Sequence, residues 1–496
     1  MKRYNFLYVL YIFLFISSAM NSTCLSQTKN SELELIFMQP DSASSDSENP
    51  LYTIITNSET IKTYKGYLKN EPAEWALFLY SEALKIAGDH TPSQPVYHIA
   101  IVSGGNNAAA GFRLRSGSEI KSYPNTPYII LAPDDWIFTT TFLHETGHAI
   151  LSLLNGGRHL PYKGLIPIPH STAALSERST AFDEGFAIHL ETLAGYFCNN
   201  DVVIQRYRHN SYLFGIPYIQ SEYHRQVSDL LTYSQSRSRY YDVAENIFAF
   251  NAACREPEYF RVQLEKTRDF SSLRNANQLL QSEGFNASFF YSFLMRNIKN
   301  PSADSVKARQ IKMLKALKAM FASTEINSES PLLLHFVENY IKLYPKEAAE
   351  TADVFSELTH GVFTDKKAHI IWREHYLKSL QLDLKERNNT EILNLLARWK
   401  KDIVNDPKIL YSNLGPQIKC SVPGINIDLP AFKLSNALSF DINTVEEGII
   451  KMIPQISDKE VSSFLNRRAE MPFSGVDDFK TRSGLNGKTL ERLVFE

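Results

Sequence analysis

The segment Phe142-Leu143-His144-Glu145-Thr146-Gly147-His148-Ala149-Ile150 places two histidines four residues apart, with a glutamate directly after the first. On an α-helix, residues i and i+4 project from the same face, so the imidazoles of His144 and His148 can meet one metal ion. Zinc is the usual metal for histidine and carboxylate ligands. Glu145 fits poorly as a third ligand but well beside a metal-bound water. The pattern predicts a metal-binding helix; the alternative is a buried helix with two incidental histidines.

The flanking residues predict where this helix begins and ends. Asp134 or Asp135, after Pro133, can cap its start, and the segment Asn155-Gly156-Gly157 is typical of a helix end. Apolar residues on its other faces would bury it in a core, namely Trp136, Phe142, Leu143, Ile150, Leu153 and Leu154.

A catalytic zinc ion needs three protein ligands and one open position. A second helix, expected from about Thr180 to Phe197, offers four candidates for the third ligand: Asp183, Glu184, His189 and Glu191. We favour Glu184, because Gly185 beside it would allow the two helices to approach closely. Asp183 or Glu191 would then orient a zinc-bound histidine from behind, or else remain exposed charges on the helix.

The segment from Phe182 to Glu191 resembles the Asn-Glu-Gly-Phe-Ala-x-Tyr-x-Glu segment of zinc aminopeptidases in the gluzincin clan (clan MA), where the first Glu is the third zinc ligand. The resemblance implies that Glu184 has this role and that the surrounding domain has the gluzincin metallopeptidase fold. The sequence departs from the family in three ways. His148 and Glu184 are separated by 35 residues, which is longer than in the family, and Asp183 and His189 replace the usual Asn and Tyr. No Gly-Ala-Met-Glu-Asn-type segment precedes the metal helix, so exopeptidase specificity is not implied.

The resemblance also implies a mechanism. Zinc lowers the pKa of its bound water to about 7 and polarises the scissile carbonyl, while Glu145 acts as general base. Related enzymes stabilise the oxyanion with a Tyr or His. The candidates are Tyr212, Tyr218, Tyr223 and His224, of which we choose Tyr223; the alternative for each is a ring packed in the core.

The first residues are typical of a secretory signal peptide, which we place at residues 1–24. Lys2 and Arg3 precede an apolar run from Phe6 to Ile16, which is followed by small residues. The run is shorter than the roughly 20 residues that span a bilayer, and a buried N-terminal helix is the alternative. We expect a secreted or periplasmic protein without a transmembrane span, or, as a variant, one that is lipid-anchored through Cys24.

Composition excludes little beyond an overall attraction to nucleic acid. The chain has 496 residues, 44% hydrophobic and 21% charged, with a formal net charge of -2, as in ordinary globular proteins. Besides Cys24 there are three cysteines, Cys198, Cys254 and Cys420; two of these could pair in an oxidising compartment, and the sequence does not specify which.

The pattern of segments predicts an α+β fold that is mostly α. A flexible leader (25–50) precedes a zinc metallopeptidase domain (51–300), in which short strands at 97–102, 111–115 and 128–131 form a small sheet before the metal helix. A helical extension (301–425) follows, with helices expected at 308–321, 331–344, 367–384 and 390–404. Residues 426–496 form a separate module.

This last segment resembles the tandem helix-hairpin-helix module of bacterial competence DNA receptors and of the minor pseudopilin K of type II secretion. The resemblance rests on Ile442-Asn443-Thr444, on Pro472-Phe473-Ser474 with Asp478-Phe479, and on the turn Gly484-Leu485-Asn486-Gly487. A helix is expected to open at Asp441, and another to run from Lys459 to Arg468. The first turn, Gln455-Ile456-Ser457, lacks glycine, and residues 426–496 contain nine basic and eleven acidic residues. We therefore expect this module to bind a protein partner or to have a structural role, and not to bind DNA.

The sequence thus predicts a secreted or periplasmic zinc metallopeptidase that hydrolyses peptide bonds. One alternative is a non-catalytic binding protein with a peptidase fold, whose C-terminal module docks a protein. Another is a DNA-associated protein, which the acidic balance disfavours. The presence of Glu145 favours the interpretation as an enzyme, because a structural zinc site does not require a general base.

Overall fold

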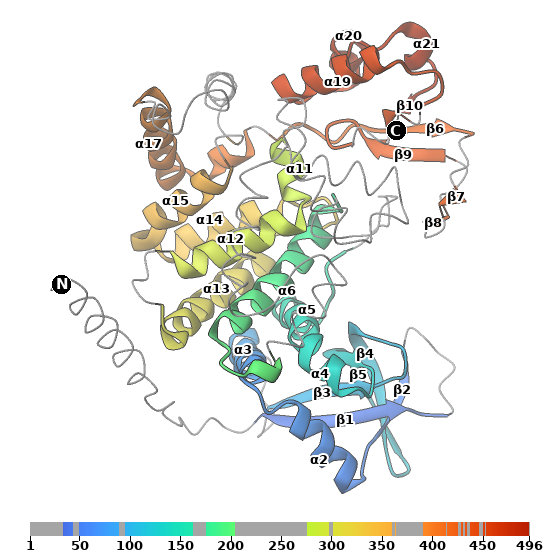
Figure 1. Cartoon of the computed structure of the whole chain (residues 1–496), viewed down its shortest axis with the longest axis vertical. Coiled ribbons are helices and arrows are strands. Elements are labelled where there is room, and N and C mark those ends of the chain that lie inside the picture. The colour runs from blue at the N-terminus through green and yellow to red at the C-terminus, as the bar shows by residue number, and fades with distance from the viewer. Residues whose placement is uncertain are drawn as a thin grey trace, which may run out of the picture.

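The computed structural model describes residues 33–42, 49–88, 95–161, 175–203, 275–296, 301–359, 363, 390–412, 414–424, 428–429, 432–433, 437–445, 450–451 and 453–495. The fold is mixed α+β, and helices account for 56% of these described residues. Figure 1 shows a small barrel at the bottom, a central group of helices, and the C-terminal sheet with the last helices of the chain at the top. Several predicted features lie outside the described residues: the signal peptide, the helix at 367–384, Cys24, Cys254, Tyr212, Tyr218, Tyr223 and His224.

The small sheet before the metal helix is a closed barrel with strand order β1-β2-β4-β5-β3. Its strands are β1 (Glu34–Pro40), β2 (Leu51–Ile54), β3 (Val96–Ile101), β4 (Asn107–Ser116) and β5 (Glu119–Leu131). Side chains on alternate faces of β3 enter two different clusters, as the pleat requires. Tyr97, Ile99 and Ile101 join the large core shared with the helices, whereas Ala100 joins a smaller cluster around Tyr52, Phe112 and Tyr128.

The leader predicted at 25–50 is wrong at residues 34–40, because these residues form β1. This strand pairs in parallel with β3 and antiparallel with β2, which closes the barrel. The driving force is the apolar run from Leu35 to Met38: Phe37 is 2% exposed and Met38 is fully buried. The barrel therefore begins before the predicted domain boundary at residue 51.

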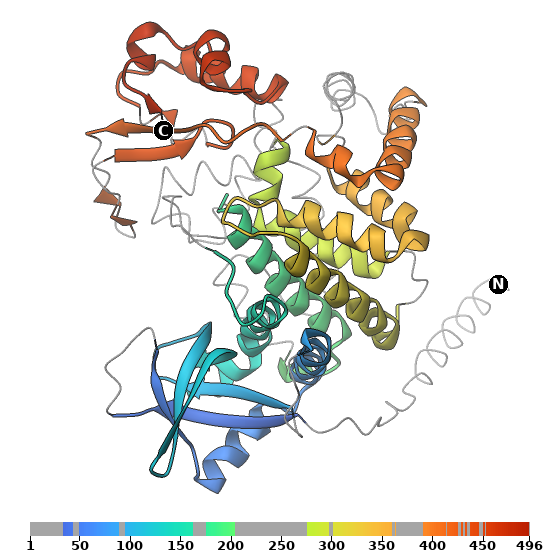
Figure 2. The same ribbon diagram turned by 180° about the vertical axis from the view of Figure 1, so that it is seen from behind.

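The helices, with their bounds, are α2 (Ser58–Tyr67), α3 (Glu71–Ala87), α4 (Asp135–Thr140), α5 (Phe142–Leu154), α6 (Arg178–Phe197), α11 (Ala276–Leu280), α12 (Glu283–Met295), α13 (Ala303–Ser323), α14 (Leu332–Leu343), α15 (Ala348–Thr359) and α17 (Thr390–Asn405). Short 3-10 helices occupy Pro345–Glu347 and Pro407–Tyr411. The helix α5 packs against α3, α6 and β5, and α6 packs against α12 on its other side. The metal helix predicted from sequence is therefore central to the fold, as Figure 2 also shows from behind.

The helical extension predicted at 301–425 shares the core of the metal helix instead of forming its own. The helix α13 contacts both α3 and α5. One continuous cluster of buried apolar residues runs from Phe37 in the barrel to Leu410. The helices expected at 308–321, 331–344 and 390–404 correspond to α13, α14 and α17.

The C-terminal module begins earlier than the predicted residue 426. Strand β6 (Lys419–Pro423) lies between β9 (Ala437–Asp441) and β10 (Val494–Phe495) in an antiparallel sheet, and β7 (Asp428–Leu429) pairs with β8 (Phe432–Lys433). Helices α19 (Asp458–Glu470), α20 (Val476–Arg482) and α21 (Gly487–Leu490) complete the module.

The helix expected to open at Asp441 does not begin there. Asp441 is the last residue of β9, and its carboxylate accepts hydrogen bonds from the backbone amides of Ile418 (2.8 Å) and Asn443 (2.8 Å), which forms a turn. A short polar side chain that bonds nearby backbone amides favours a turn as readily as a helix start. By contrast, α19 confirms the helix predicted from Lys459 to Arg468.

Among the described residues, no helix combines the length and the apolar character needed to cross a lipid bilayer.

Candidate metal centre

The helix that carries both histidines begins later than its sequence signals suggest. Asp134 does cap a helix, accepting a hydrogen bond from the backbone amide of Trp136 (2.8 Å), but this is the short α4, which ends before Thr141. Helix α5 then starts at Phe142. Its predicted end is confirmed: Asn155 is the C-cap, and Gly156 and Gly157 follow with φ of 73° and 76°, in the left-handed region that favours glycine.

Two glycines allow α6 to approach its neighbours, and their roles differ from the prediction. A Cβ on Gly147 would lie 2.9 Å from the Cα of Ala187, so Gly147 is the residue that permits close contact between α5 and α6. Gly185 instead faces α12, where a Cβ would lie 2.4 Å from the Cβ of Asn286. Adjacent helical residues point about 100° apart, so Gly185 does not share the direction of Glu184.

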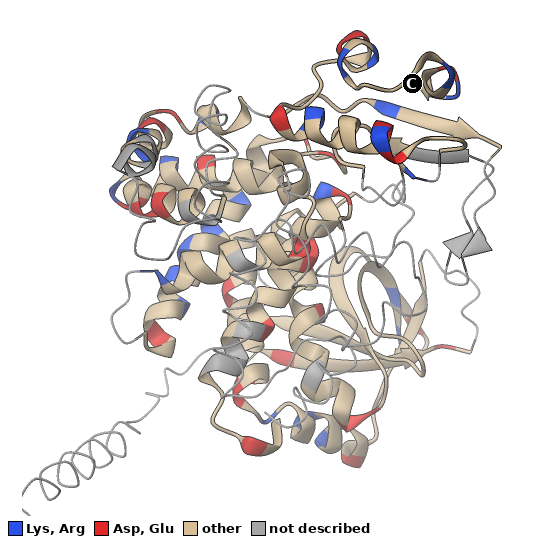
Figure 3. Cartoon of the chain, turned by 45° about the horizontal axis from the view of Figure 1, so that its top comes forward, with Lys and Arg blue, Asp and Glu red and all other residues tan. Residues whose placement is uncertain are grey.

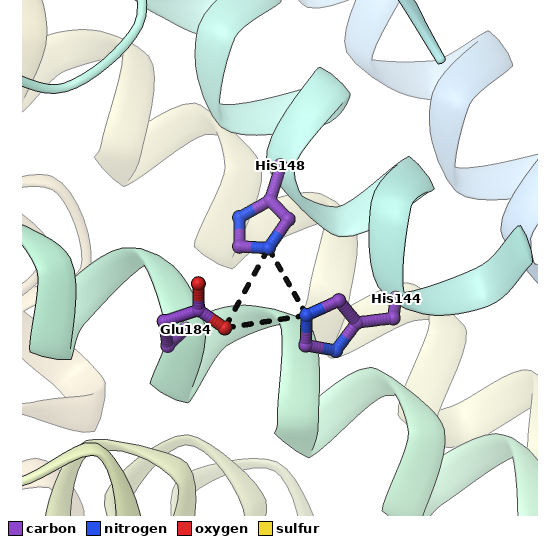
Figure 4. Close-up of side chains that lie close together, drawn as sticks. All are labelled: His144, His148 and Glu184. Atoms are coloured by element: carbon purple, nitrogen blue, oxygen red, sulfur yellow. Dashed lines mark hydrogen bonds and ion pairs between the residues drawn. The ribbon is translucent and has the colours of Figure 1, made fainter. Parts of the chain in front are cut away.

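Three side chains from α5 and α6 converge on one point, as Figure 4 shows. The Nε2 atoms of His144 and His148 are 3.1 Å apart, and the Glu184 Oε2 atom lies 3.2 Å from the first and 3.7 Å from the second. Ligands about 2.0–2.1 Å from a tetrahedral zinc ion are about 3.3–3.4 Å from each other. The three separations bracket this value, so the donor set fits a zinc ion without rearrangement.

A carboxylate lies behind each imidazole. The Nδ1 atom of His148 is 2.8 Å from an Asp183 oxygen, and the Nδ1 atom of His144 is 3.2 Å from a Glu191 oxygen. The sequence offered Asp183 and Glu191 as alternatives for this role, and both occupy the position. An Nδ1 proton donated to a carboxylate leaves the Nε2 lone pair directed at the convergence point.

The same carboxylates control the protonation of the imidazoles. Burial lowers the pKa of His144, but the charges of Glu191 and Glu184 outweigh it, and the pKa lies well above its ordinary value. For His148, burial is likewise outweighed, chiefly by Asp183, which raises the pKa to about 9. Protons and a metal ion therefore compete for the same nitrogen atoms.

Glu145 is buried next to the two imidazoles. Its residue exposure is 7%, and burial raises the pKa of its carboxyl, partly offset by His144 and His148. A raised pKa suits a general base that works near neutral pH. The adjacent Thr146 is held in place, because Tyr97 donates a hydrogen bond to its Oγ1 (3.0 Å) and that hydroxyl donates to the Phe142 carbonyl (2.7 Å).

Other candidate residues do not join the site. His189 is fully buried, its ring packs against Phe186 and Phe290, and burial lowers its pKa to about 3. It is therefore a core residue and not the third ligand. Cys198 and Cys420 are both buried, and neither is part of the site.

Sequence reasoning missed His159 and the role of Gly147. His159 lies on the segment after α5, and the charges of both Asp183 and His148 act on it. The only sequence signal was its position shortly after the metal helix. Gly147 lies between the two histidines, and an isolated glycine inside a helix is itself a signal of close packing.

Comparison of the chain with protein-family models, curated protein sequences and solved structures gave no significant match. The assignment of this site therefore depends on its geometry and on the chemistry of its donor atoms. Within the described part of the chain, His144, His148 and Glu184 form the one group of three such residues that could hold a metal ion.

Proposed function

We propose that this chain is a secreted or periplasmic zinc-dependent metallopeptidase of the gluzincin type. His144, His148 and Glu184 hold the zinc ion, and Glu145 is the general base. The observation that supports this most directly is the convergence of the three donor atoms, with Asp183 and Glu191 orienting the two imidazoles.

The number of ligands favours catalysis over a structural metal site. Structural zinc sites are closed by four protein ligands, whereas catalytic sites have three and keep one position open. No fourth His, Cys, Asp or Glu atom joins the cluster among the residues that the structure describes. The buried Glu145 directly beside the two histidines supplies the base that hydrolysis requires.

A bound zinc ion would supply Lewis acidity, which polarises a carbonyl and makes water more acidic. Glu145 accepts the proton of the attacking water and delivers it to the leaving amine. With a metal ion bound, His144 and His148 would be neutral, and each would keep its Nδ1 proton and donate it in a hydrogen bond to Glu191 or Asp183. Tyr223 as the group that stabilises the oxyanion stays a prediction, because it lies outside the described residues.

The decisive experiment compares the wild type with Glu145→Gln. The variant should retain about one zinc ion per chain and lose peptide hydrolysis by about 10²–10⁴-fold, the usual contribution of a general base. Zinc is measured by elemental analysis, and hydrolysis with a library of fluorogenic peptides. Glu59→Gln, a change at an exposed position in the first turn of α2, is the matched control. Equal cleavage by wild type and Glu145→Gln would contradict the proposal.

The C-terminal module supports a protein contact or a structural role more than DNA binding. Arg468, Arg482 and Arg492 all donate to backbone carbonyls inside the module. Figure 3 shows acidic and basic residues interspersed over these helices. These three arginines are engaged within the module, which leaves fewer cations to neutralise phosphates.

One backbone amide in each turn of the module bonds an internal carboxylate. Glu460 accepts hydrogen bonds from the backbone amides of Ser457 (3.1 Å) and Asn486 (3.0 Å). DNA-binding hairpins present such amides to a phosphate group. A non-catalytic peptidase-fold protein with a docking module is therefore our second candidate, and the Glu145→Gln comparison separates it from an enzyme.

A further inference from the structure

Helix α6, which carries Glu184, begins at the junction with the C-terminal module. The short helix α11 lies between the C-terminal sheet and the central helices in both Figure 1 and Figure 2. The first residue of α6 is Arg178, which is 6% exposed. Glu184 lies six positions further along the helix, about 9 Å along its axis.

Arg178 takes part in two hydrogen-bonded connections to the residues that lead into the module. Its Nη2 atom donates to the Oδ1 atom of Asn277 (2.8 Å), and the Nδ2 atom of Asn277 donates to the carbonyl of Gly415 (3.2 Å). Its Nη1 atom donates to the carbonyl of Glu329 (2.7 Å), whose carboxylate accepts a hydrogen bond from Gln417. Asn277 is 1% exposed, so this connection is shielded from water.

The module is joined to α11 at a further point. Asn275 donates to the carbonyl of Asn443 (2.8 Å), and Gln278 donates to the carbonyl of Thr444 (3.2 Å). Asn443 is fully buried, and its side chain bonds the backbone of Pro416 and Phe473, which organises the module internally. Buried polar groups that satisfy one another in this way resist separation, because breaking one leaves its partner unpaired.

We propose that Arg178 is a positioning residue for the metal centre: it ties the first turn of α6 to the C-terminal module, so that the module holds Glu184 and Asp183 in register with the two histidines. This rests on the proposed metal-binding role of Glu184. The module is then a part of the metal centre's support, although it contributes no ligand.

Two variants test this from opposite ends of the connection. Arg178→Met replaces the aliphatic part of the side chain and removes its hydrogen-bond donors. Gly415→Ala leaves Arg178 unchanged, but its Cβ would lie 2.5 Å from the rigid ring of Pro472 and 2.9 Å from the Nδ2 atom of Asn443, which wedges the junction. Gly487→Ala is the control within the module, because nothing lies within 4 Å of its added Cβ.

The first measurement is hydrogen–deuterium exchange of the full-length chain without metal. Peptides that cover residues 178–191 should exchange about tenfold faster in Arg178→Met and Gly415→Ala and be unchanged in Gly487→Ala. Unchanged exchange in this segment, with faster exchange at residues 437–445 in Gly415→Ala, would overturn the coupling. This arm needs no metal, so it decides the coupling even if the wild type binds none. If Arg178→Met does not fold, Gly415→Ala still decides.

The second measurement is metal binding, by chelator competition and by the visible spectrum of the Co²⁺-loaded chain, which reports ligand geometry. We expect Zn²⁺ affinity to fall about tenfold or more in both variants, in the range seen when support around ligands is lost. A shifted Co²⁺ spectrum separates positioning from a general loss of stability. An unaltered spectrum and affinity in both variants would overturn the positioning role, whereas absent zinc binding by the wild type would refute the proposed function itself.

Discussion

Each imidazole of the candidate metal centre is held on two sides. The outer nitrogen of His148 contacts Asp183 and that of His144 contacts Glu191, while both inner nitrogens face Glu184. Such outer partners fix the orientation of the ring and make the ligand more basic. The two carboxylates would thus favour binding of a metal ion without being ligands themselves.

Loss of the Asp183 charge should weaken zinc binding. Asp183→Asn keeps the size of the side chain but removes the anion that is 2.8 Å from the His148 Nδ1 atom. We expect the dissociation constant for Zn²⁺ to rise about 10–100-fold, as for comparable changes around other metal sites. Chelator competition measures it, with the exposed Asp201→Asn as control. An unchanged dissociation constant would show that Asp183 is only a surface charge.

Zinc binding should release protons at neutral pH. Without metal, the neighbouring carboxylates raise the pKa of His148 to about 9 and that of His144 well above its ordinary value, which favours protonated rings at pH 7. The two Nε2 atoms are 3.1 Å apart, so only one of them can direct a proton at the other. Zinc binds neutral imidazole, so binding should release at least one proton, and affinity should fall as pH falls, by about tenfold or more per unit. Calorimetry in two buffers of different ionisation enthalpy counts the protons. A count near zero at pH 7 would mean that the rings are already neutral.

The residues of the site were predictable to different degrees. The i, i+4 spacing of His144 and His148 is enough to place both on one face of a helix. Glu184 needed the resemblance to a family, because no local rule distinguishes it from Asp183 or Glu191. Which carboxylate meets which imidazole depends on the rotation and depth of α6 against α5, and that is decided by packing.

At the scale of elements, the contact between α5 and α6 depends on Gly147. Gly147→Ala would place a Cβ 2.9 Å from the backbone of Ala187 and force the two helices apart. We expect a loss of about 1–3 kcal/mol in the free energy of unfolding, typical of overpacking, together with weaker zinc binding. Chemical denaturation measures the first. Gly66→Ala in α2, with nothing within 4 Å of the new Cβ, should be neutral or slightly stabilising.

Prediction of elements succeeded where local signals dominate and failed where long-range pairing does. Helix α13 follows from its apolar stripe, and the end of α5 follows from Asn155 and its two glycines. Strand β1 is short and follows a polar stretch, and it is defined by its pairing with β3, which is distant in sequence. Tertiary context decides such strands.

At the scale of the whole molecule, we expect no binding to DNA. The wild type should not retain a duplex of about 20 base pairs at micromolar protein and about 0.15 M salt, because its module has an excess of acidic residues and Arg468 and Arg482 bond internal carbonyls. A gel-shift or fluorescence-anisotropy titration measures this. Binding that weakens steeply with added salt would contradict the expectation and favour the DNA-associated alternative.

The shared core explains why the boundaries between domains were hard to predict. Polar residues and prolines mark surface segments, but they do not reveal whether the helices on either side share one hydrophobic cluster. Here the buried residues from Phe37 to Leu410 do so, and the buried Asn275 joins the module to this body. The helices could be predicted from the sequence, but the core that they share could be seen only in the folded structure.

The closure of the barrel by β1 sets a limit on trimming of the N-terminus. Proteolytic removal of residues upstream of Glu34 leaves all five strands of the barrel intact. A cut beyond Pro40 would strip the backbone of β2 and β3 of a neighbour along one side, and exposed strand edges recruit strands from other chains. Proteolytic trimming is therefore expected to be tolerated on the N-terminal side of β1 and to promote aggregation on the other.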